Sequence, residues 1–417
     1  MKIVKLGTTV AALITVAFTA TTVTPGVATG THLRGAEESS VRAGQVVLDW
    51  ERIAFRTIYG SPPAPPTTPI PAGVPLLGFT SMAMYDAIGR SFQRDDSSEQ
   101  AAVAAAAHGV LTTYFPLQRT DLDIFLQATR DKVPDGRAER VGVRIGRRAA
   151  ARMIESRHHD GYGDPTFHYN KPDLPGYWQP PPETGDMLAA WLGSLRPLVL
   201  RGTVEVDGPP QLTSRAYARE FNEVRRLGSA TSTDRTKKQT ATALFYNSNS
   251  AVMVGDALIR LLENEPIGPR RTARLFAAMH AAMTDTVIRC WELKRDVGFW
   301  RPSEAIAKAD QDANPHTTAE TGWTPLVANP PYSDYVSGHA CLTGPAVEII
   351  RQTLGEHTRL ELVSANSPDP RVFERLRTIE HQAFMARIWS GLHFRTAMED
   401  GYYIGHKTAR RVLQRLP

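Results

Sequence analysis

Three short segments near the C-terminal end combine cations with histidines and helix-breaking residues. The first begins at Lys294 and ends at Arg301, directly before Pro302. Lys294 lies one turn after Cys290 in a predicted helix over 270–295, so it extends a buried face, where a lysine needs an anion as partner. Taken alone, this segment also fits two solvated cations near a helix end.

The second segment is Ser337-Gly338-His339, which leads into a predicted helix over 340–354. A Ser-Gly pair that opens a helix presents a hydroxyl and free backbone N–H groups, and the helix dipole favours an anion there. His339 at the mouth of such a cradle can transfer protons. The alternative is a Ser N-cap beside an exposed histidine.

The third segment runs from Arg387 to His393. Ser390 and Gly391 break one helix, and His393 begins the next, so Arg387 and His393 project into the same break. Alone, the pair also fits an ordinary helix end. Together the three segments supply three cations, a hydroxyl, N–H donors and two histidines without a carboxylate. A tetrahedral oxyanion of high charge requires such a set.

The order K-x6-R-P, then S-G-H, then R-x5-H resembles the type 2 phosphatidic acid phosphatase and vanadium-dependent haloperoxidase superfamily. The likeness covers most of the chain and is most specific after Phe276. Flanking residues are similar to the secreted bacterial haloperoxidase-like branch, and these are Phe299 to Pro302, Trp323 to Leu326, Leu392 to Arg395 and Gly176 to Pro182.

The resemblance implies a vanadate cofactor, whose place phosphate can take. It makes His393 the metal ligand and His339 the residue that moves protons, so both histidines are the expected catalytic residues. The groups that bind the cofactor oxygens are then Lys294, Arg301, Ser337, Gly338 and Arg387.

Three positions depart from the superfamily pattern. Val336 replaces a proline, Ala386 a serine, and Ala397 an aspartate that follows the second histidine. We expect the first two to adjust the cradle only. The third removes a carboxylate that would orient His393, so we expect none behind His393 from this turn. That loss argues against a phosphohistidine and matters less for a stationary ligand.

The leading function is therefore a vanadate-dependent peroxidase that oxidises halide with hydrogen peroxide and passes the product to an unidentified organic acceptor. The first alternative is an exported acid phosphatase that uses the same pocket on phosphate esters, because vanadate and phosphate share their geometry. The second is a non-catalytic oxyanion-binding relative. The halide, the organic substrate and the oligomeric state stay open.

The elements that position these residues are predicted to be helices. The pattern indicates an all-α fold of two packed helical bundles, residues 29–205 and 206–417, with the oxyanion site in the second. Residues 161–182, rich in Gly, Pro and Tyr and including Trp178, are predicted to form a long loop. The predicted helices span 41–59, 75–94, 99–115, 120–133, 138–157, 214–226, 234–246, 251–262, 270–295, 340–354, 371–389 and 394–416.

Composition and charge exclude several classes of protein. With 42% apolar and 22% charged residues, the 417-residue chain is an ordinary globular protein. A net charge of +5 without dense Lys/Arg runs argues against a nucleic-acid partner. Residues 1–28 read as a signal peptide cleaved near Ala28, with a buried helix or a membrane anchor as alternatives. We expect a secreted protein without a stable membrane span after processing.

Further aromatic and acidic residues are weaker candidates. By family analogy, Tyr332 lies where halide preference is tuned. Trp300 and Trp323 could line the pocket, although packed tryptophans are commoner. Asp285, on the helix of Lys294, could pair with a site arginine.

Two other groups invite a chemical reading. His158, His159 and Asp160 resemble a metal cluster, but a polar loop at a helix end fits them better. Cys290 and Cys341 could form a disulfide in an exported protein or remain buried thiols, and the sequence does not decide between the two.

Overall fold

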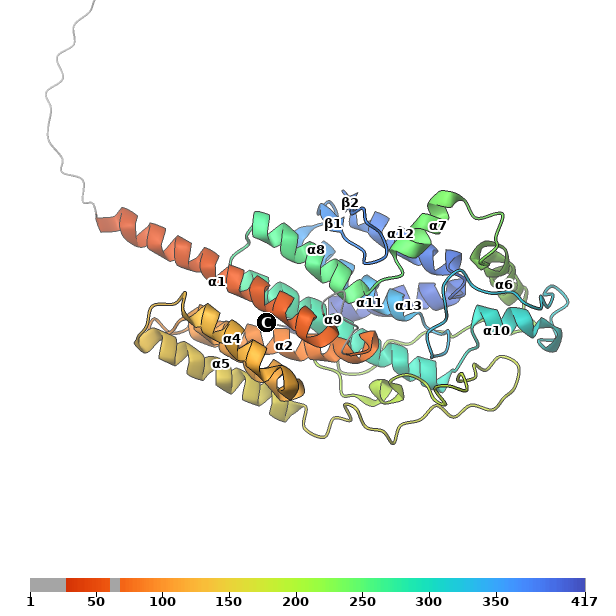
Figure 1. The fold of residues 1–417 in the computed structure, drawn as a ribbon, viewed down its shortest axis with the longest axis horizontal. Helices are drawn as coiled ribbons and strands as arrows, with labels where there is room; N and C mark the ends of the chain where they lie inside the picture. Colours follow the sequence, from red (N-terminus) through yellow and green to blue (C-terminus); the bar gives the residue numbers. More distant parts are fainter. Residues whose placement is uncertain (1–27, 61–67, 417) are drawn as a thin grey trace, which may run out of the picture. The chain divides into compact units, whose positions relative to one another are not determined.

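Helices dominate the part of the chain that the structure describes. The computed structural model, drawn in Figure 1, describes residues 28–60 and 68–416. The chain divides into residues 1–39 and 40–417. Of the first unit, the described part is the beginning of helix α1 (Ala28–Tyr59). The signal peptide predicted for residues 1–28 therefore lies outside the described residues, apart from Ala28.

The N-terminal helices of the second unit pack closely through small residues. Glycines on α5 face the backbone of α3, where an added Cβ at Gly142 would lie 2.3 Å from the Ser98 oxygen, and one at Gly146 only 2.2 Å from the Ala102 oxygen. Ser98 also caps α3, because its side chain accepts a hydrogen bond from the Ala101 amide. After the end of α1, these helices are α2 (Ile70–Phe92), α3 (Glu99–Tyr114), α4 (Arg119–Arg130) and α5 (Arg137–Ser156).

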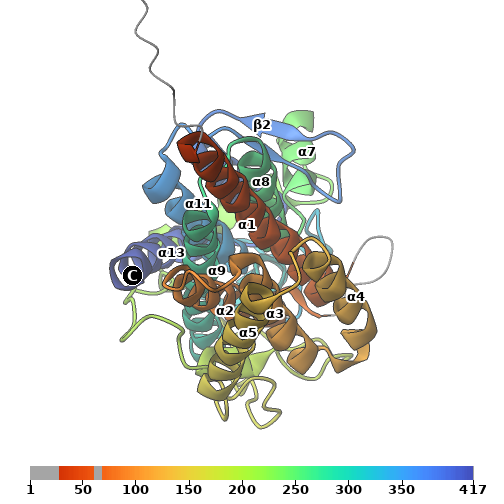
Figure 2. The ribbon, with the colours of Figure 1, turned by 90° about the vertical axis from the view of Figure 1, so that its left-hand side faces the viewer.

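Helix α9 connects the two halves of this unit. It packs against α2 on one side and against α11 and α13 on the other (Figure 2). Its side chains are buried along most of its length. The C-terminal helices are α6 (Arg215–Gly228), α7 (Lys237–Phe245), α8 (Ser250–Asn264), α9 (Pro269–Asp296), α10 (Pro302–Ala307), α11 (Gly338–Leu354), α12 (Leu376–Trp389) and α13 (Arg395–Arg415).

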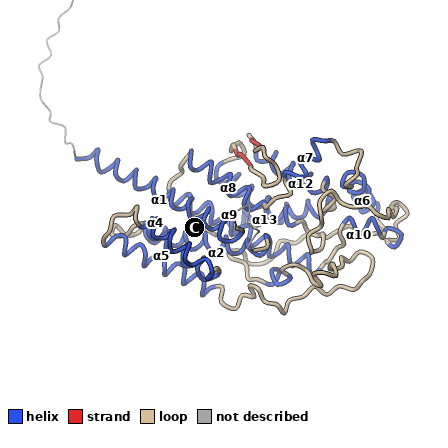
Figure 3. The backbone as a smooth tube through the Cα atoms, viewed as in Figure 1, coloured by secondary structure: helices blue, strands red, loops and turns tan. Residues whose placement is uncertain are grey.

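Strands and short 3-10 helices make up the rest of the regular structure. Strands β1 (Leu360–Leu362) and β2 (Arg371–Phe373) pair antiparallel, with Leu360 opposite Phe373 (Figure 3). The helix predicted from residue 371 therefore begins at Leu376, and that prediction was wrong at its start. Three-residue strands are too short to give an alternating pattern. The 3-10 helices are Pro116–Gln118, Ala190–Ser194 and Ala309–Gln311.

Prolines account for two further differences from the predicted helices. Helix α2 begins at Ile70 and continues through Pro75, which the pattern had placed at its start. Helix α10 lies between the helices predicted over 270–295 and 340–354, where no helix was predicted. It begins at Pro302 because proline fits the first turn of a helix. The long loop over 161–182 was predicted correctly.

The all-α fold of two packed helical bundles is confirmed. The boundary near residue 205 stays a prediction. Among the described residues, no helix has the length and apolar character needed to cross a membrane.

Candidate oxyanion site

Lys294 lies in the last turn of α9 and is fully buried. Its Nζ donates hydrogen bonds to the backbone oxygens of Ser333 (2.8 Å) and Asp334 (3.0 Å), and it lies 4.8 Å from the ring centre of Tyr332. Burial lowers the pKa of Lys294 to about 8. The ammonium group is thus held by neutral acceptors, and a nearby anion would favour its charged form.

Arg301 occupies the position before the first turn of α10, and its side chain is buried. Its Nε donates to the Tyr332 oxygen (2.8 Å) and its Nη1 to the Leu392 oxygen (2.9 Å). Its Nη2 has no hydrogen-bond partner. Two carbonyl groups therefore fix the guanidinium and leave one nitrogen free for a further acceptor.

The long loop that contains Gly176 and Trp178 holds the segment before Arg301 in place. The Trp178 amide donates to the Gly298 oxygen (2.8 Å), and the Trp300 amide donates to the Gly176 oxygen (2.9 Å). This pairing spans more than a hundred residues of sequence. The loop therefore contributes to the position of Arg301 without supplying a side chain to the site.

Ser337 and Gly338 open helix α11. Ser337 is fully buried, and its Oγ has no hydrogen-bond partner. Gly338 is the first residue of the helix, so its N–H is one of the four that the helix itself does not use. A Cβ at Gly338 would lie 3.4 Å from the ring of Trp291. The helix start therefore offers a hydroxyl and an N–H group, as expected for an anion cradle.

Arg387 lies in the last turn of α12 and is buried. Its Nη1 donates a long hydrogen bond (3.5 Å) to the Tyr246 oxygen, and its Nε has no partner. Burial lowers the pKa of Arg387 to about 10. A buried guanidinium with so few hydrogen bonds to replace its hydration destabilises the protein unless an anion binds it.

His393 lies in the break between α12 and α13, and a carboxylate supports it. Its Nδ1 lies 2.7 Å from Asp334 Oδ1, and its Nε2 lies 3.4 Å from Arg301 Nη1. Burial lowers the pKa of His393 and raises that of Asp334, while the charges of Arg301 and Lys294 act to lower the pKa of Asp334. Gly391 makes the break possible, because its φ is +76° and an added Cβ would lie 2.5 Å from the Gly228 oxygen.

The pairing with Asp334 supplies an orienting carboxylate that the sequence had not indicated. Ala397 leaves none on α13, but Asp334 reaches His393 from the segment before Ser337. The pattern had not singled out Asp334. A weak signal was available: of the carboxylates between Arg301 and the Ser-Gly-His segment, Asp334 is the last, and it stands three residues before Ser337.

His339 lies in the first turn of α11 and is half-buried. Its Nε2 lies 3.2 Å from the Ser248 oxygen. Burial lowers its pKa, and the neighbouring charge of Arg387 lowers it further. Charges on Arg301 and Lys294 act on both His339 and His393. The two histidines thus border the same cluster of cations.

The structure brings the three segments together. The cradle is defined here by six residues, which are Lys294, Arg301, Ser337, Gly338, Arg387 and His393. Buried polar atoms without partners are rare in proteins, yet three lie in the cradle: Arg301 Nη2, Arg387 Nε and Ser337 Oγ. All three can donate to oxygen. The cradle therefore fits a tetrahedral oxyanion such as vanadate or phosphate.

Asp285 does not pair with a site arginine, so that prediction was wrong. Its carboxylate accepts hydrogen bonds from the backbone amides of Leu198, Val199 and Leu200. These hydrogen bonds hold residues 198–200, which lie between the two halves of the unit, against α9. A carboxylate that accepts several backbone N–H groups has a structural role that residue spacing does not reveal.

Other candidates from the sequence make contacts that are typical of structural residues. Asp160 pairs with Arg157 at the end of α5, and the described residues contain no group of three or more His, Cys, Asp or Glu that could hold a metal ion. Trp323 donates to the Arg225 oxygen. Both cysteines are free thiols and buried, which settles the choice that the sequence had left open.

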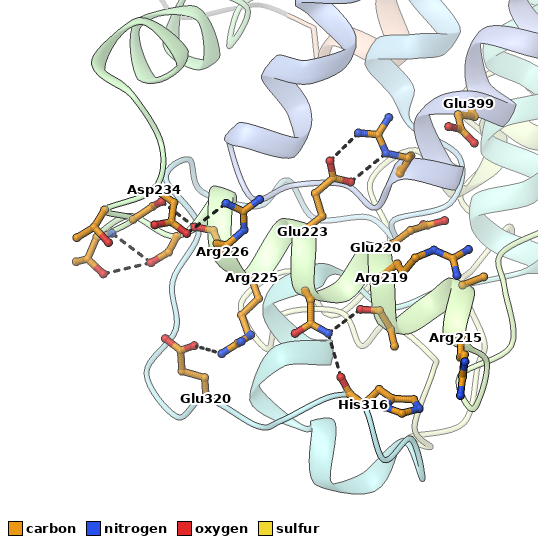
Figure 4. Close-up of a pocket in the computed structure, with 18 residues that line it drawn as sticks. Arg215, Arg219, Glu220, Glu223, Arg225, Arg226, Asp234, His316, Glu320 and Glu399 are labelled. Atoms are coloured by element: carbon orange, nitrogen blue, oxygen red, sulfur yellow. Dashed lines mark hydrogen bonds and ion pairs between the residues drawn. The ribbon is translucent and has the colours of Figure 1, made fainter.

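A hollow of about 1480 Å³ on the face of α6 lies apart from the cradle. Its lining is charged, and Figure 4 shows Arg226 beside Asp234 (3.3 Å) and Arg225 beside Glu320 (3.4 Å). No cradle residue lines it. Because oppositely charged side chains pair within it, we regard it as a solvated surface and not as the site of the chemistry.

Comparison with known proteins finds a match over the region that contains the cradle. The family model described as "VCPO second helical-bundle domain" matches residues 274–417, a region that includes every cradle residue. The C-terminal third of the chain therefore resembles the second helical bundle of a vanadium chloroperoxidase. Vanadium chloroperoxidase from Curvularia inaequalis is 27% identical to it over 178 residues, which is 34% of this chain and 29% of that relative's length.

Solved structures of bacterial vanadium-dependent peroxidases share the fold. A bacterial vanadium-dependent iodoperoxidase aligns with a TM-score of 0.68 at 18% identity, covering 91% of this chain and 97% of the other. The holo form of a bacterial vanadium-dependent chloroperoxidase aligns with a TM-score of 0.65 at 16% identity, covering 83% and 92%. The chain thus shares the helical fold of these structures along most of its length.

Proposed function

We propose that this protein is a vanadate-dependent haloperoxidase that oxidises halide with hydrogen peroxide. The observation that carries the proposal is the cradle, where buried cations and a buried hydroxyl keep unfilled hydrogen-bond donors. Three buried cations need a multiply charged anion, and vanadate is such an anion. When bound, vanadate supplies a Lewis acid that activates peroxide without a change in metal oxidation state.

The cradle residues would hold vanadate through its oxygens. Arg301 Nη2, Arg387 Nε and Ser337 Oγ are the free donors, and the Gly338 N–H adds the positive end of helix α11. Lys294 adds charge from the end of α9. His393 would be the metal ligand, because its Nδ1 is already occupied by Asp334 and its Nε2 is the remaining ring nitrogen.

His339 would move the proton. With Nε2–H donating to the Ser248 oxygen, the lone pair is on Nδ1, which is the atom that can accept a proton from peroxide. The lowered pKa of His339 keeps the ring neutral at pH 7, ready to accept that proton. The organic acceptor of the oxidised halide stays unidentified.

An acid phosphatase is the second candidate, and one observation favours it. The Asp334 carboxylate behind His393 is the kind of orienting group that a nucleophilic histidine needs. In that case the same donors would bind the oxygens of a phosphate ester, and His393 Nε2 would bond to phosphorus as the P–O bond to the alcohol breaks. Water would then cleave the N–P bond and release phosphate. Both candidates use the same cradle and differ in what His393 does.

Parallel assays on one anion-free preparation test the proposal. Oxidation of chloride, bromide and iodide is measured with peroxide, with and without vanadate, and phosphate release from an aryl phosphate is measured beside it. We expect halide oxidation only with vanadate and peroxide together, and competition between phosphate and vanadate. Arg226→Ala, which changes an exposed ion pair, serves as the matched control for cradle variants.

Other outcomes would redirect the assignment. Phosphate release without vanadate, together with a labelled phosphohistidine at position 393, would establish the phosphatase. Tight vanadate binding without either activity would establish a non-catalytic oxyanion-binding relative.

We also propose that the protein is exported after removal of residues 1–28. The support is the charged start, the apolar run and the small residues before Thr29. N-terminal sequencing of protein from the culture medium should give a start near Thr29. Intact Met1 on cytoplasmic protein would contradict export.

A further inference from the structure

We propose that Asp334 is a positioning residue that fixes the tautomer of His393 and so directs the Nε2 lone pair into the cradle. The inference rests on the proposed function, since it deepens the role of His393 there. It assigns to Asp334 the task of the carboxylate that Ala397 has replaced. The support comes from hydrogen bonding, from the anchoring of Asp334 and from the packing at Ala397.

The hydrogen bond sets which ring nitrogen is available. Asp334 Oδ1 lies 2.7 Å from His393 Nδ1, and both side chains are about 98% buried or more. A neutral imidazole has one N–H, and a carboxylate in its ionised form, which the nearby charges of Arg301 and Lys294 favour for Asp334, can only accept. With the proton on Nδ1, the lone pair is on Nε2, which lies 3.4 Å from Arg301 Nη1 on the cradle side.

Asp334 is itself held by its backbone. Its amide donates to the Phe299 oxygen (2.9 Å), and its carbonyl oxygen accepts a hydrogen bond from Lys294 Nζ (3.0 Å). One residue therefore contacts the segment of Lys294 and Arg301 through its backbone and the segment of His393 through its side chain. A carboxylate anchored in this way can hold the imidazole ring at one angle.

The packing at position 397 explains why the carboxylate comes from elsewhere. Ala397 is buried, and its carbonyl oxygen accepts a hydrogen bond from the Ser337 amide (2.8 Å). One turn later, a Cβ at Gly401 would lie 2.7 Å from the Ala340 Cβ. Helices α11 and α13 therefore touch through small residues on this face. Asp334, on the loop before α11, supplies the negative charge instead.

The test compares Asp334→Asn with Asp285→Asn. Both substitutions remove a buried carboxylate, but only Asp334 contacts His393, whereas Asp285 binds the backbone amides of residues 198–200. Two quantities are measured on folded protein: the tautomer of His393 by ¹⁵N-histidine NMR without any anion, and the equilibrium affinity for vanadate. The spectrum of His393→Ala identifies the His393 signals.

We expect the wild-type His393 to carry its proton on Nδ1, with a strongly hydrogen-bonded proton signal. Asp334→Asn should shift the population toward Nε2–H, because the amide group can donate to Nδ1. Vanadate affinity should then fall about 10–100-fold, as is typical when a partner behind a metal ligand is lost. Asp285→Asn should leave both quantities unchanged.

Two results would overturn the inference. One is an Nε2–H tautomer in the wild-type protein, a measurement that needs no variant and stands even if Asp334→Asn does not fold. The other is a folded Asp334→Asn protein with unaltered vanadate affinity. Wild-type protein that binds no vanadate but shows Nδ1–H would contradict the proposed function while supporting the positioning of His393 by Asp334.

Discussion

Helix α9 contributes to two buried polar clusters that differ in charge. Near its middle, His280 belongs to a neutral cluster with Glu51 and Ser81, in which Ser81 Oγ lies 2.7 Å from Glu51 Oε1 and 2.8 Å from His280 Nδ1. At its end, Lys294 belongs to the cradle. Both clusters are buried, and both include polar atoms without a hydrogen-bond partner.

The charge of each cluster follows from its residue types. Burial raises the pKa of Glu51 to about 8 and lowers that of His280 to about 3, so both groups are neutral at pH 7. The two arginines of the cradle cannot become neutral in the same way, because their pKa values start so high. Burial alone therefore does not mark a ligand site, whereas buried charge with unfilled donors does. The predictions below test this distinction.

The largest expected effects concern the two histidines at the cradle. His393→Ala should abolish stable vanadium binding, because it removes the only proposed metal ligand. His339→Ala should keep the metal and lose turnover by about 10²–10⁴-fold, the usual size of general acid–base help. Vanadium content and steady-state halide oxidation are measured on the same samples. Equal loss of metal in both variants would contradict the separate roles.

Arg387→Ala should weaken vanadate binding by about 3 kcal/mol, or more than about 100-fold, because a desolvated anion loses a charged donor. The anion-free variant should be at least as stable as wild type, since an uncompensated buried cation is gone. Binding isotherms and thermal unfolding without anion check the two parts. Arg226→Ala, which breaks an exposed ion pair, should lower the free energy of unfolding by about 0–1 kcal/mol. Strong destabilisation of the anion-free Arg387 variant would show that its charge is already compensated.

Ser81→Ala should lower the stability of the protein without weakening vanadate binding, which is the opposite of the effect expected for Arg387→Ala. It leaves Glu51 and His280 buried without their shared partner, which should cost about 1–3 kcal/mol of unfolding free energy. Vanadate affinity should stay at the wild-type value because the neutral cluster binds no anion. Denaturant unfolding and vanadate titration are the measurements. If vanadate affinity falls by more than partial unfolding explains, the neutral cluster and the cradle are energetically coupled.

The neutral cluster should also shape the pH dependence of stability. The Glu51 pKa is raised from 4.5 to about 8. Its contribution to the free energy of unfolding is therefore full below pH 4.5 and is lost as pH rises to 8. The His280 pKa is lowered from 6.5 to about 3. Its contribution to the free energy of unfolding is therefore full above pH 6.5 and is lost as pH falls to 3. The two effects oppose each other between pH 4.5 and 6.5.

Glu51→Gln isolates one side of this dependence, because the amide cannot ionise. Between pH 6.5 and 8, wild type should lose stability relative to the variant by at most about 1.4 kcal/mol per pH unit. Unfolding free energies at several pH values check the slope. Parallel curves for the two proteins over this range would mean that Glu51 is already ionised in the folded state.

Residue order and periodicity were sufficient for much of the molecule. The apolar spacing along 270–295 predicted α9 almost to its ends, because helical periodicity depends only on neighbours within two turns. The three cation and histidine segments could be found in the same way, since each is short and contiguous. Their spacing also placed them at helix ends, which is where the structure has Lys294, Ser337 and Arg387.

Contacts between distant residues were decided only by the tertiary structure. The sequence indicated that Ala397 leaves His393 without a carboxylate, and it could not show that Asp334 lies 2.7 Å away. It likewise gave no reason for Asp285 to bind three backbone amides on another segment. Such pairings depend on how loops of irregular conformation pack against helices, and no periodic pattern encodes that packing. The sequence by itself therefore determined which groups are present and on which helix ends, while the packing of α9, α11 and α13 decided which of them meet.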